Sequence, residues 1–346
     1  MSSRIGVVAI GRNEGPRLRR CLASAGSCAA VVVYVDSASS DDSVAFAQSV
    51  GAHVVALDMS VPFSAARARN AGFQRLLEIA PSVDYVQFVD GDSEIAPGWM
   101  PHAQELLDAR ATTAIAAGRC REHYPDRTIY NRLCDLEWDT PPGVVKSCGG
   151  NAMMRVEAFR AVGGFDPTVI AGEEPEMCVR LRAAGWKVYR VDAAMTWHDA
   201  DMHRFGQWWR RVVRSGYAYA EGAWMHGGKP ERHCVRESLS IWFWAAAVPL
   251  GALALAWPTG GWSLLLLLGY VVLAWRISRY ARRRNWPASD ALLYTSFIML
   301  GKFPQLLGQL KFFCLRAVGR RSQIIEYKVP RPKAMLRPAQ SFHSVR

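Results

Sequence analysis

The amino-acid sequence predicts an α/β fold with a mostly parallel sheet flanked by helices, followed by transmembrane or interfacial helices. Over the first 90 residues, short apolar runs alternate with helical stretches, which is the pattern of βαβ units. Three of these apolar runs end in a cluster of polar residues. In the last third of the chain, long uncharged stretches bordered by arginine and lysine replace the alternation.

The elements of the first part follow from these patterns in order. Parallel strands are expected at the apolar runs 5–10, 30–35, 53–57 and 85–89. Helical periodicity predicts helices between them, at 16–25, 43–50 and 65–79. Because ligands bind beyond the carboxyl ends of such strands, the polar clusters at 11–14, 36–42 and 90–92 are expected to meet in one crevice.

The middle of the chain is less regular. A short strand at 152–154 is expected to lead into a helix that ends at 162. An amphipathic helix at 173–184 ends at Gly185, which is a usual stop signal. A last strand is expected at 187–191.

The net charge of +12 is confined to the C-terminal third. Residues 236–346 hold 16 basic and 3 acidic residues, which leaves 26 basic and 27 acidic residues before them. Basic residues that border apolar stretches indicate an anionic membrane surface. A nucleic-acid partner is not expected, because the globular part is close to neutral.

The apolar stretches predict a helical hairpin at about 239–280. Its first stretch, 239–257, has no charge, and the second, 262–275, is followed by five arginines that place this end on the cytoplasmic side. A third stretch is interrupted by Lys302, Pro304 and Lys311, which favours interfacial or re-entrant helices at about 290–318.

Three regions are therefore expected. Residues 1–235 form the globular domain, 236–330 the membrane domain, and 331–346 a basic, disordered tail. Eight cysteines without a Cys-x-x-Cys pair argue against zinc and are typical of reduced, buried thiols. No signal peptide precedes the first strand, so we expect a globular domain in the cytoplasm, held at the inner membrane.

Asp90-Gly91-Asp92 follows the fourth strand. Two carboxylates one residue apart can share a divalent cation such as Mg²⁺ or Mn²⁺, and Gly91 lets a diphosphate approach. The alternative is a solvated Asp-Gly turn. The position after a series of βαβ units favours the metal.

The cluster at 36–42 follows the second strand. Asp36 there can accept hydrogen bonds from a base or a ribose. The alternative is that Ser40, Asp41 and Asp42 cap the next helix, and both roles are compatible.

Arg69 lies in the helix after the third strand and can clamp phosphate oxygens. A solvated helix face explains it equally well.

Glu173 and Glu174 begin a helix, where acidic residues stabilise the helix dipole. Alternatively, one of them is a general base that takes a proton from an attacking hydroxyl. His198 follows a strand; a lone histidine is often structural, but this one can complete the metal site of the aspartates.

The segment Gln207, Trp208, Trp209 and Arg210 is rich in aromatic and basic side chains. Such residues stack on sugars and bind diphosphates of a donor or acceptor. The alternative is a helix at the membrane interface, where tryptophan and arginine are equally common.

In combination, these motifs resemble family 2 glycosyltransferases of the GT-A fold, over about residues 4–235. The resemblance lies in the order of the motifs, of which no single one is specific. They are Asn13-Glu14, the loop from Asp36 to Asp42, Arg69-Asn70-Ala71-Gly72, Asp90-Gly91-Asp92, Gly149-Gly150-Asn151, Gly163-Gly164-Phe165-Asp166, and Gly172-Glu173-Glu174 through Arg180 to Gly185.

The resemblance implies an inverting hexosyltransferase that uses a nucleotide sugar, which we expect to be a UDP-sugar, with a divalent cation. It implies Asp92, Asp90 and His198 as metal ligands, and Glu174, with Glu173 as the rival, as the catalytic base. The residues implied to bind the nucleotide sugar are Asn13, Glu14, Asp36, Arg69, Asp90, Gly91, Gly150 and Asn151.

Two departures from the family pattern are informative. Glu174 stands where the family usually has aspartate. Gln207-x-x-Arg210 is followed by Arg211 rather than by the tryptophan of the processive synthases. We therefore expect transfer of a single sugar to a lipid-linked or membrane-proximal glycan acceptor, in polysaccharide or glycolipid synthesis.

Two other functions compete with this one. A sugar nucleotidyltransferase would carry a Gly-x-Gly-x-Arg loop after the first strand, and Gly11-Arg12-Asn13-Glu14-Gly15 does not supply it. A non-catalytic membrane scaffold of the same fold would be expected to lose the paired aspartates or the acidic helix start, and both are present.

Overall fold

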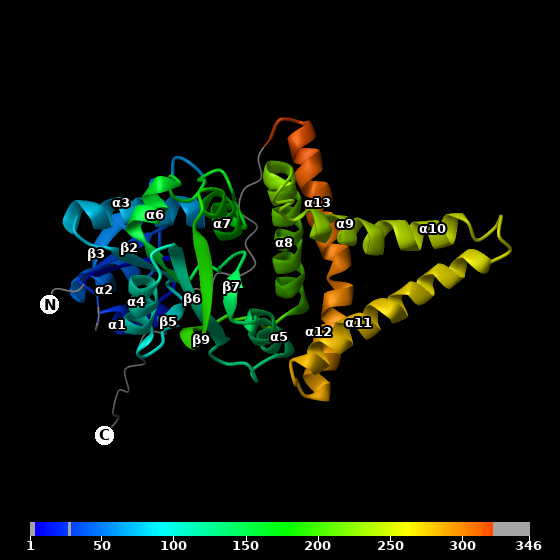
Figure 1. The fold of residues 1–346 in the computed structure, drawn as a ribbon, viewed down its shortest axis with the longest axis horizontal. Coiled ribbons are helices and arrows are strands. Elements are labelled where there is room, and N and C mark those ends of the chain that lie inside the picture. The colour runs from blue at the N-terminus through cyan, green and yellow to red at the C-terminus, as the bar shows by residue number, and fades with distance from the viewer. Residues whose placement is uncertain (1–3, 27–28, 321–346) are drawn as a thin grey trace, which may run out of the picture.

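The computed structural model describes residues 4–26 and 29–320. A mixed sheet forms the core of the globular part (Figure 1). Its strands are β1 (Ile5–Gly11), β2 (Val31–Asp36), β3 (His53–Ala56), β4 (Tyr85–Asp90), β5 (Ser93–Ile95), β6 (Thr113–Glu122), β7 (Gly143–Val145), β8 (Ala152–Arg155) and β9 (Lys187–His198). They lie in the order β3-β2-β1-β4-β8-β6-β9-β5, and β7 pairs with β9.

The parallel half of the sheet confirms the strands expected in the first 90 residues. β1 pairs in parallel with β2 and with β4, so Gly11 lies beside Asp36 and Ile10 lies beside Asp90. The carboxyl ends of the three strands therefore meet at one edge, and the polar clusters that follow them converge as expected.

Helices cover both faces of the sheet because strand side chains alternate between them. Val8 on β1 packs toward one set of helices, and Val7 packs toward the other. The first set is α3 (Ala65–Ile79), α6 (Val156–Ala161) and α7 (Glu173–Ala183); the second is α1 (Pro16–Ala25), α2 (Ser43–Ser49) and α4 (Trp99–Ala109).

The structure adds elements that the sequence patterns did not indicate, namely β5, α4, β6, β7 and α5 (Ile129–Trp138). It also corrects the last strand, which we expected to end at 191 and which continues to His198. The apolar pattern stops at Asp192, but irregular pairing with β6 carries the strand past that point.

Two long helices stand beside the sheet domain. α8 (Phe205–His226) packs along α13 (Lys302–Ala317), which follows α12 (Ala288–Leu300). The crossing of α8 and α13 is close, because a Cβ on Gly216 would lie 2.0 Å from the carbonyl oxygen of Gln305. The helix pair expected near 290–318 is thus present and packs partly on the globular side; its contact with a membrane stays a prediction.

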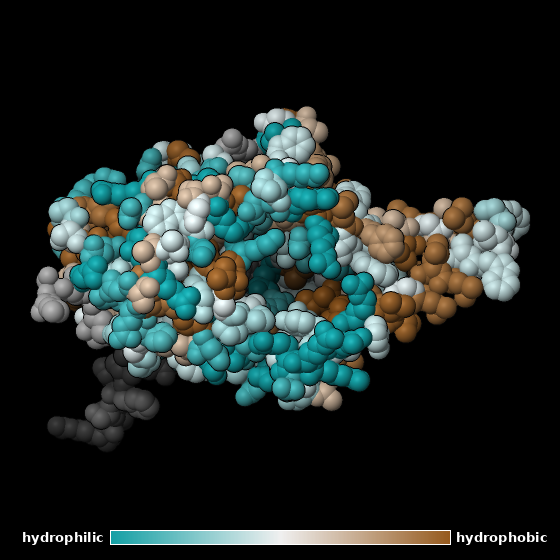
Figure 2. All heavy atoms as spheres, in the orientation of Figure 1, coloured by the Kyte–Doolittle hydropathy of each residue, from teal (hydrophilic) through white to brown (hydrophobic). Residues whose placement is uncertain are grey.

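A helical hairpin projects away from this body (Figure 1). One arm runs through α9 (Val235–Trp242), η1 (Phe243–Ala247) and α10 (Val248–Ala254), and the other through η2 (Trp262–Leu268) and α11 (Gly269–Arg283). Both arms are long and apolar enough to cross a membrane, and their apolar surface is largely uncovered (Figure 2). The predicted tail at 331–346 lies outside the described residues.

Candidate active site

The end of β4 carries the predicted metal-binding motif. The backbone N–H of Gly91 donates to the carbonyl oxygen of Ile10 at 2.7 Å. A Cβ on Gly91 would lie 3.1 Å from that oxygen and 3.2 Å from Cγ of Glu14. A side chain at this position would thus be crowded, and glycine lets the end of β4 lie close against β1, with the two aspartates at the shared edge.

Asp90, Asp92 and His198 form one cluster. One ligand atom from each lies within 4.8 Å of the others, and His198 Nε2 is 3.2 Å from Asp92 Oδ1. Pairing of β5 with β9 sets His198 opposite Ser93, directly after Asp92. Burial lowers the pKa of His198, which favours the neutral ring, and a neutral imidazole has one nitrogen that can bind a metal ion. Two carboxylates and an imidazole fit Mn²⁺ or Mg²⁺.

Asn151 holds the metal-binding segment in place. Its Oδ1 accepts from the Asp90 backbone N–H at 2.8 Å. Its Nδ2 donates to Ser93 Oγ at 3.0 Å and to Thr196 Oγ1 at 3.3 Å. The buried amide thus ties β4, β5 and β9 together; its direct contact with a nucleotide sugar stays a prediction.

Arg69 lies at the centre of three carboxylates and is only 2% exposed. Its Nη1 donates to Glu173 Oε1 at 2.9 Å and to Glu174 Oε1 at 2.8 Å, and its Nη2 donates to Asp90 Oδ1 at 2.8 Å. The guanidinium therefore joins the metal-binding segment to the first turn of α7. A contact between Arg69 and phosphate stays a prediction, since carboxylates occupy both terminal nitrogens in this structure.

Glu174 has a raised pKa and is the more exposed of the two glutamates. Burial, and after it the negative charge of Glu173, raises the pKa of Glu174 to about 7. The side chain of Glu174 is 12% exposed, whereas that of Glu173 is 5% exposed. Of the two carboxylates, Glu174 is therefore the more accessible, and it can exchange a proton near neutral pH.

Gly150 leaves room for this pair. A Cβ on Gly150 would lie 2.2 Å from Arg69 Nη2 and 2.9 Å from Glu174 Oε1. The glycine of the predicted motif thus admits the arginine and the glutamate, and a role in binding the nucleotide sugar stays a prediction.

The loops after β1 and β2 are joined to each other. Asn13 Oδ1 accepts from the Ser40 backbone N–H at 2.7 Å, and the Asn13 N–H donates to Ser39 Oγ at 2.9 Å. The carboxylate of Asp36 is 4% exposed and accepts from the Tyr34 hydroxyl and the Ser39 N–H. These bonds shape the rim on which the base and ribose are expected to lie.

Glu14 forms an ion pair near the carboxyl end of β1, and the polar cluster after β2 leads into α2. Glu14 pairs with Arg17 at 2.8 Å, and Arg17 reaches Asp201 at 3.5 Å. At the start of α2, the N-cap residue Asp42 makes no side-chain capping bond, whereas Asp41 accepts from the Ser43 N–H at 3.1 Å. The cluster therefore binds one N–H of the first turn without a regular N-cap, and the role of Asp36 stays a prediction.

The Gln207 segment has clear structural roles. Gln207 Oε1 accepts from the backbone N–H groups of His203 and Arg204 and so caps α8. Trp208 is 1% exposed and packs edge-on against Phe297, which leaves no open ring face for a sugar. Trp209 is half-buried and Arg210 is exposed, and their contact with an acceptor or diphosphate stays a prediction.

Sequence patterns missed Glu122, at the end of β6. This carboxylate is 1% exposed and accepts from Asn131 Nδ2 at 3.1 Å and from the N–H groups of Tyr124 and Ala200 at 3.1 and 3.0 Å. Burial raises its pKa. The Glu122 carboxylate thereby holds the segment that follows His198 against α5. The alanine-rich strand before it gave no signal for this role.

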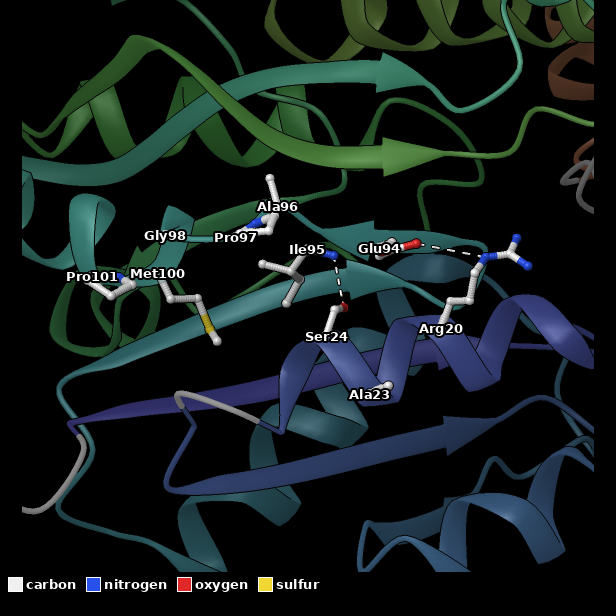
Figure 3. A pocket seen from close by; sticks show the side chains of 10 residues that line it. All are labelled: Arg20, Ala23, Ser24, Glu94, Ile95, Ala96, Pro97, Gly98, Met100 and Pro101. Carbon is white, nitrogen blue, oxygen red and sulfur yellow. Dashed lines mark hydrogen bonds and ion pairs between the residues drawn. The ribbon is translucent and has the colours of Figure 1, made fainter.

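A pocket of about 340 Å³ lies between α1 and the segment from β5 to α4 (Figure 3). Its polar groups are already paired, Arg20 with Glu94 and Ser24 Oγ with the Ile95 N–H. None of its lining residues is a predicted site residue. The pocket is therefore separate from the carboxylate cluster.

The sequence models of two protein families match the chain. Residues 7–163 match "Glycosyl transferase family 2", and residues 129–300 match "Glycosyl transferase family group 2". The two ranges overlap and together extend from β1 to α12.

Individual proteins resemble parts of the chain. A pre-mycofactocin glycosyltransferase of Mycobacterium tuberculosis is 30% identical over 203 residues, which are 54% of this chain and 41% of that protein. The chain thus spans about two fifths of the length of this relative. The succinoglycan biosynthesis protein ExoA of Rhizobium meliloti is 43% identical over 44 residues, 13% of each chain.

A solved structure shares the fold. The mannosyltransferase PcManGT from Pyrobaculum calidifontis, in complex with GDP-Man and Mn²⁺, superposes with a TM-score of 0.59. The match covers 89% of this chain and 87% of that one, at 18% sequence identity. At this identity the likeness shows the GT-A architecture.

Proposed function

The chain belongs to glycosyl transferase family 2, and on this premise we propose that it transfers one sugar from a nucleoside-diphosphate sugar to an acceptor hydroxyl, with inversion at the anomeric carbon. The proposal rests on one observation. Arg69 donates hydrogen bonds both to Asp90, in the metal-binding segment, and to Glu174, the proposed base on α7. A metal cluster alone would also serve a nucleotidyltransferase. The adjacent carboxylate with a pKa near 7 is what transfer to a hydroxyl needs.

In the proposed step, the acceptor oxygen forms a bond to the anomeric carbon. The bond between that carbon and the phosphate oxygen breaks, and its electron pair leaves with the nucleoside diphosphate. Glu174 takes the proton of the attacking hydroxyl. Glu173 stays paired with Arg69 and so keeps the guanidinium in position.

We propose that Asp90, Asp92 and His198 hold a divalent cation. PcManGT contains Mn²⁺, and the three side chains of this chain have suitable donor atoms. His198 Nε2 faces Asp92 Oδ1 at 3.2 Å, and Nδ1 of the same ring is buried without a hydrogen-bond partner among the described residues. A bound cation would supply charge neutralisation for the departing diphosphate.

We further propose that the hairpin holds the enzyme at the cytoplasmic face of the inner membrane, with a lipid-linked or membrane-proximal glycan as acceptor. Leu250, Leu253 and Trp257 are 65%, 67% and 94% exposed, which is costly in water. Figure 2 shows the surface hollowed between the sheet domain and α8. An acceptor anchored in the membrane can enter there. The name of ExoA, which refers to succinoglycan biosynthesis, agrees with a glycan product.

The test is release of nucleoside diphosphate. Purified full chain in detergent, with Mn²⁺ or Mg²⁺ and a membrane lipid extract as acceptor, is presented with UDP-, GDP- and dTDP-sugars. Wild type should release diphosphate from one donor, and Asp92→Ala and Glu174→Gln should not. Release of pyrophosphate would instead indicate a nucleotidyltransferase. Absence of both release and metal-dependent nucleotide binding would favour the scaffold.

A further inference from the structure

The last two turns of α11 carry an exposed arginine face. Arg276, Arg279 and Arg283 are spaced by three and four residues, so they project from one side of the helix. All three are exposed, and none forms an ion pair with another described residue. By contrast, the next arginine, Arg284, pairs with Asp139 at 2.8 Å.

The part of the chain that carries this face has few acidic residues. From residue 236 to the end, the sequence holds three acidic residues. Of these, Asp290 is paired with Arg132, and Glu237 lies on the other arm of the hairpin. A solvated helix face of a soluble protein would normally mix both signs. This face therefore carries three positive charges without an ion pair to another described residue.

The same helix changes character along its length. Upstream of the arginine face, Val271 and Val272 are 65% and 56% exposed. Trp275, 59% exposed, marks the boundary, and the guanidinium of Arg279 lies 5.4 Å from the centre of its ring. An apolar surface, then a tryptophan, then arginines is the order found where a helix passes from hydrocarbon to headgroups. Figure 2 shows the hydrophilic lobe directly against the apolar hairpin.

From these observations we propose that the arginine face of α11, formed by Arg276, Arg279 and Arg283, binds the phosphates of anionic lipid headgroups. Guanidinium groups bind phosphate oxygens in a bidentate manner, and charge complementarity favours anionic over zwitterionic lipids. The inference rests on the proposed insertion of the hairpin in a membrane. It adds a lipid preference that the hairpin alone does not supply, and it would orient the enzyme on the surface.

The test measures lipids that stay with the full chain. Protein in non-ionic detergent is mixed with equal amounts of phosphatidylglycerol and phosphatidylcholine and passed through gel filtration, and both lipids are quantified. Each arginine near the surface is expected to favour the anionic lipid by about five-fold, so three give at most on the order of 100-fold. The triple variant R276Q/R279Q/R283Q should bring the ratio toward one. The triple lysine variant should keep most of the preference, which separates charge from folding.

A matched control removes three exposed basic residues far from the hairpin, in R75Q/R160Q/K187Q. This variant should retain the wild-type ratio. An unchanged ratio in the arginine-to-glutamine variant, or an equal loss in the control, would overturn the proposal. Retention of neither lipid by wild type would overturn the membrane insertion itself, and the lipid preference with it, whereas donor hydrolysis would be unaffected.

Discussion

Glu174→Gln is expected to abolish turnover and to stabilise the protein at alkaline pH. Burial beside Glu173 raises the pKa of Glu174 from 4.5 to about 7, so ionising this side chain in the folded protein costs about 3 kcal/mol more than in water. Glutamine has nearly the same shape and can still accept from Arg69, but it carries no charge. The substitution therefore removes the free-energy cost of ionising residue 174 and also removes the catalytic base.

The sign of the pH dependence follows from the raised pKa. The folded protein binds more protons than the unfolded chain between pH 4.5 and 7, so the contribution of Glu174 to stability is complete below 4.5 and is lost as the pH rises through 7. At pH 8 the variant should unfold at a temperature higher by roughly 5 °C. At pH 4.5 the two proteins should be nearly alike.

The activity of the wild-type protein should rise over the same pH range in which the stability contribution of Glu174 is lost. A base with a pKa of about 7 is about one tenth ionised at pH 6 and nine tenths at pH 8, so kcat/KM of wild type should rise roughly tenfold between them. The assays are diphosphate release across this pH range and thermal unfolding in the same buffers.

The matched control is Glu176→Gln, on the same turn of α7. Glu176 is 3% exposed and is paired with Arg180 at 2.6 Å and His226 at 3.0 Å, so its loss should destabilise the protein at both pH values. A lower unfolding temperature of Glu174→Gln, like that of Glu176→Gln, or a kcat/KM that is flat from pH 6 to 8 would show that Glu174 is not a buried base with a raised pKa.

Further substitutions test the other parts of the site. Gly150→Ala should reduce kcat at least tenfold and cost about 1–3 kcal/mol of stability, because the new Cβ would collide with the Arg69 guanidinium; activity and thermal unfolding report both. Asp92→Ala should abolish Mn²⁺ binding in a calorimetric titration, and chelation with EDTA should abolish wild-type activity. Asp290→Asn should destabilise the contact of α12 with α5 by about 1–3 kcal/mol, because it weakens the pair with Arg132; chemical unfolding measures this.

Controls for these variants come from the same chain. Gly149→Ala should be neutral, since a Cβ there would have no neighbour within 4 Å. Glu78→Gln breaks an exposed pair with Arg75 and should change stability by less than about 0.5 kcal/mol. Equal effects of Gly149→Ala and Gly150→Ala, or Mn²⁺ binding by Asp92→Ala, would contradict the assigned geometry.

The local sequence was sufficient for the parallel half of the fold. The helix at Ala65–Ile79 has helical periodicity because it buries one face against the sheet. The strands around it are continuous apolar runs with clear ends because helices cover both faces of the sheet. It was not sufficient for β6 and the end of β9. The alternation there is weak, and irregular pairing between the two strands decides where they end.

The order of residues along the chain was enough to predict which chemical groups are available: paired aspartates after an apolar strand, acidic residues at a helix start, and an apolar hairpin with arginines at its end. How these groups act on one another follows from the packing of the folded chain. Arg69 and Glu174 are 105 residues apart, and their contact depends on the packing of α3 and α7 on one face of the sheet. The raised pKa of Glu174 depends on burial and on the neighbouring charge of Glu173, which outweigh the lowering effect of Arg69, because a carboxylate in water has no reason to hold its proton at pH 7.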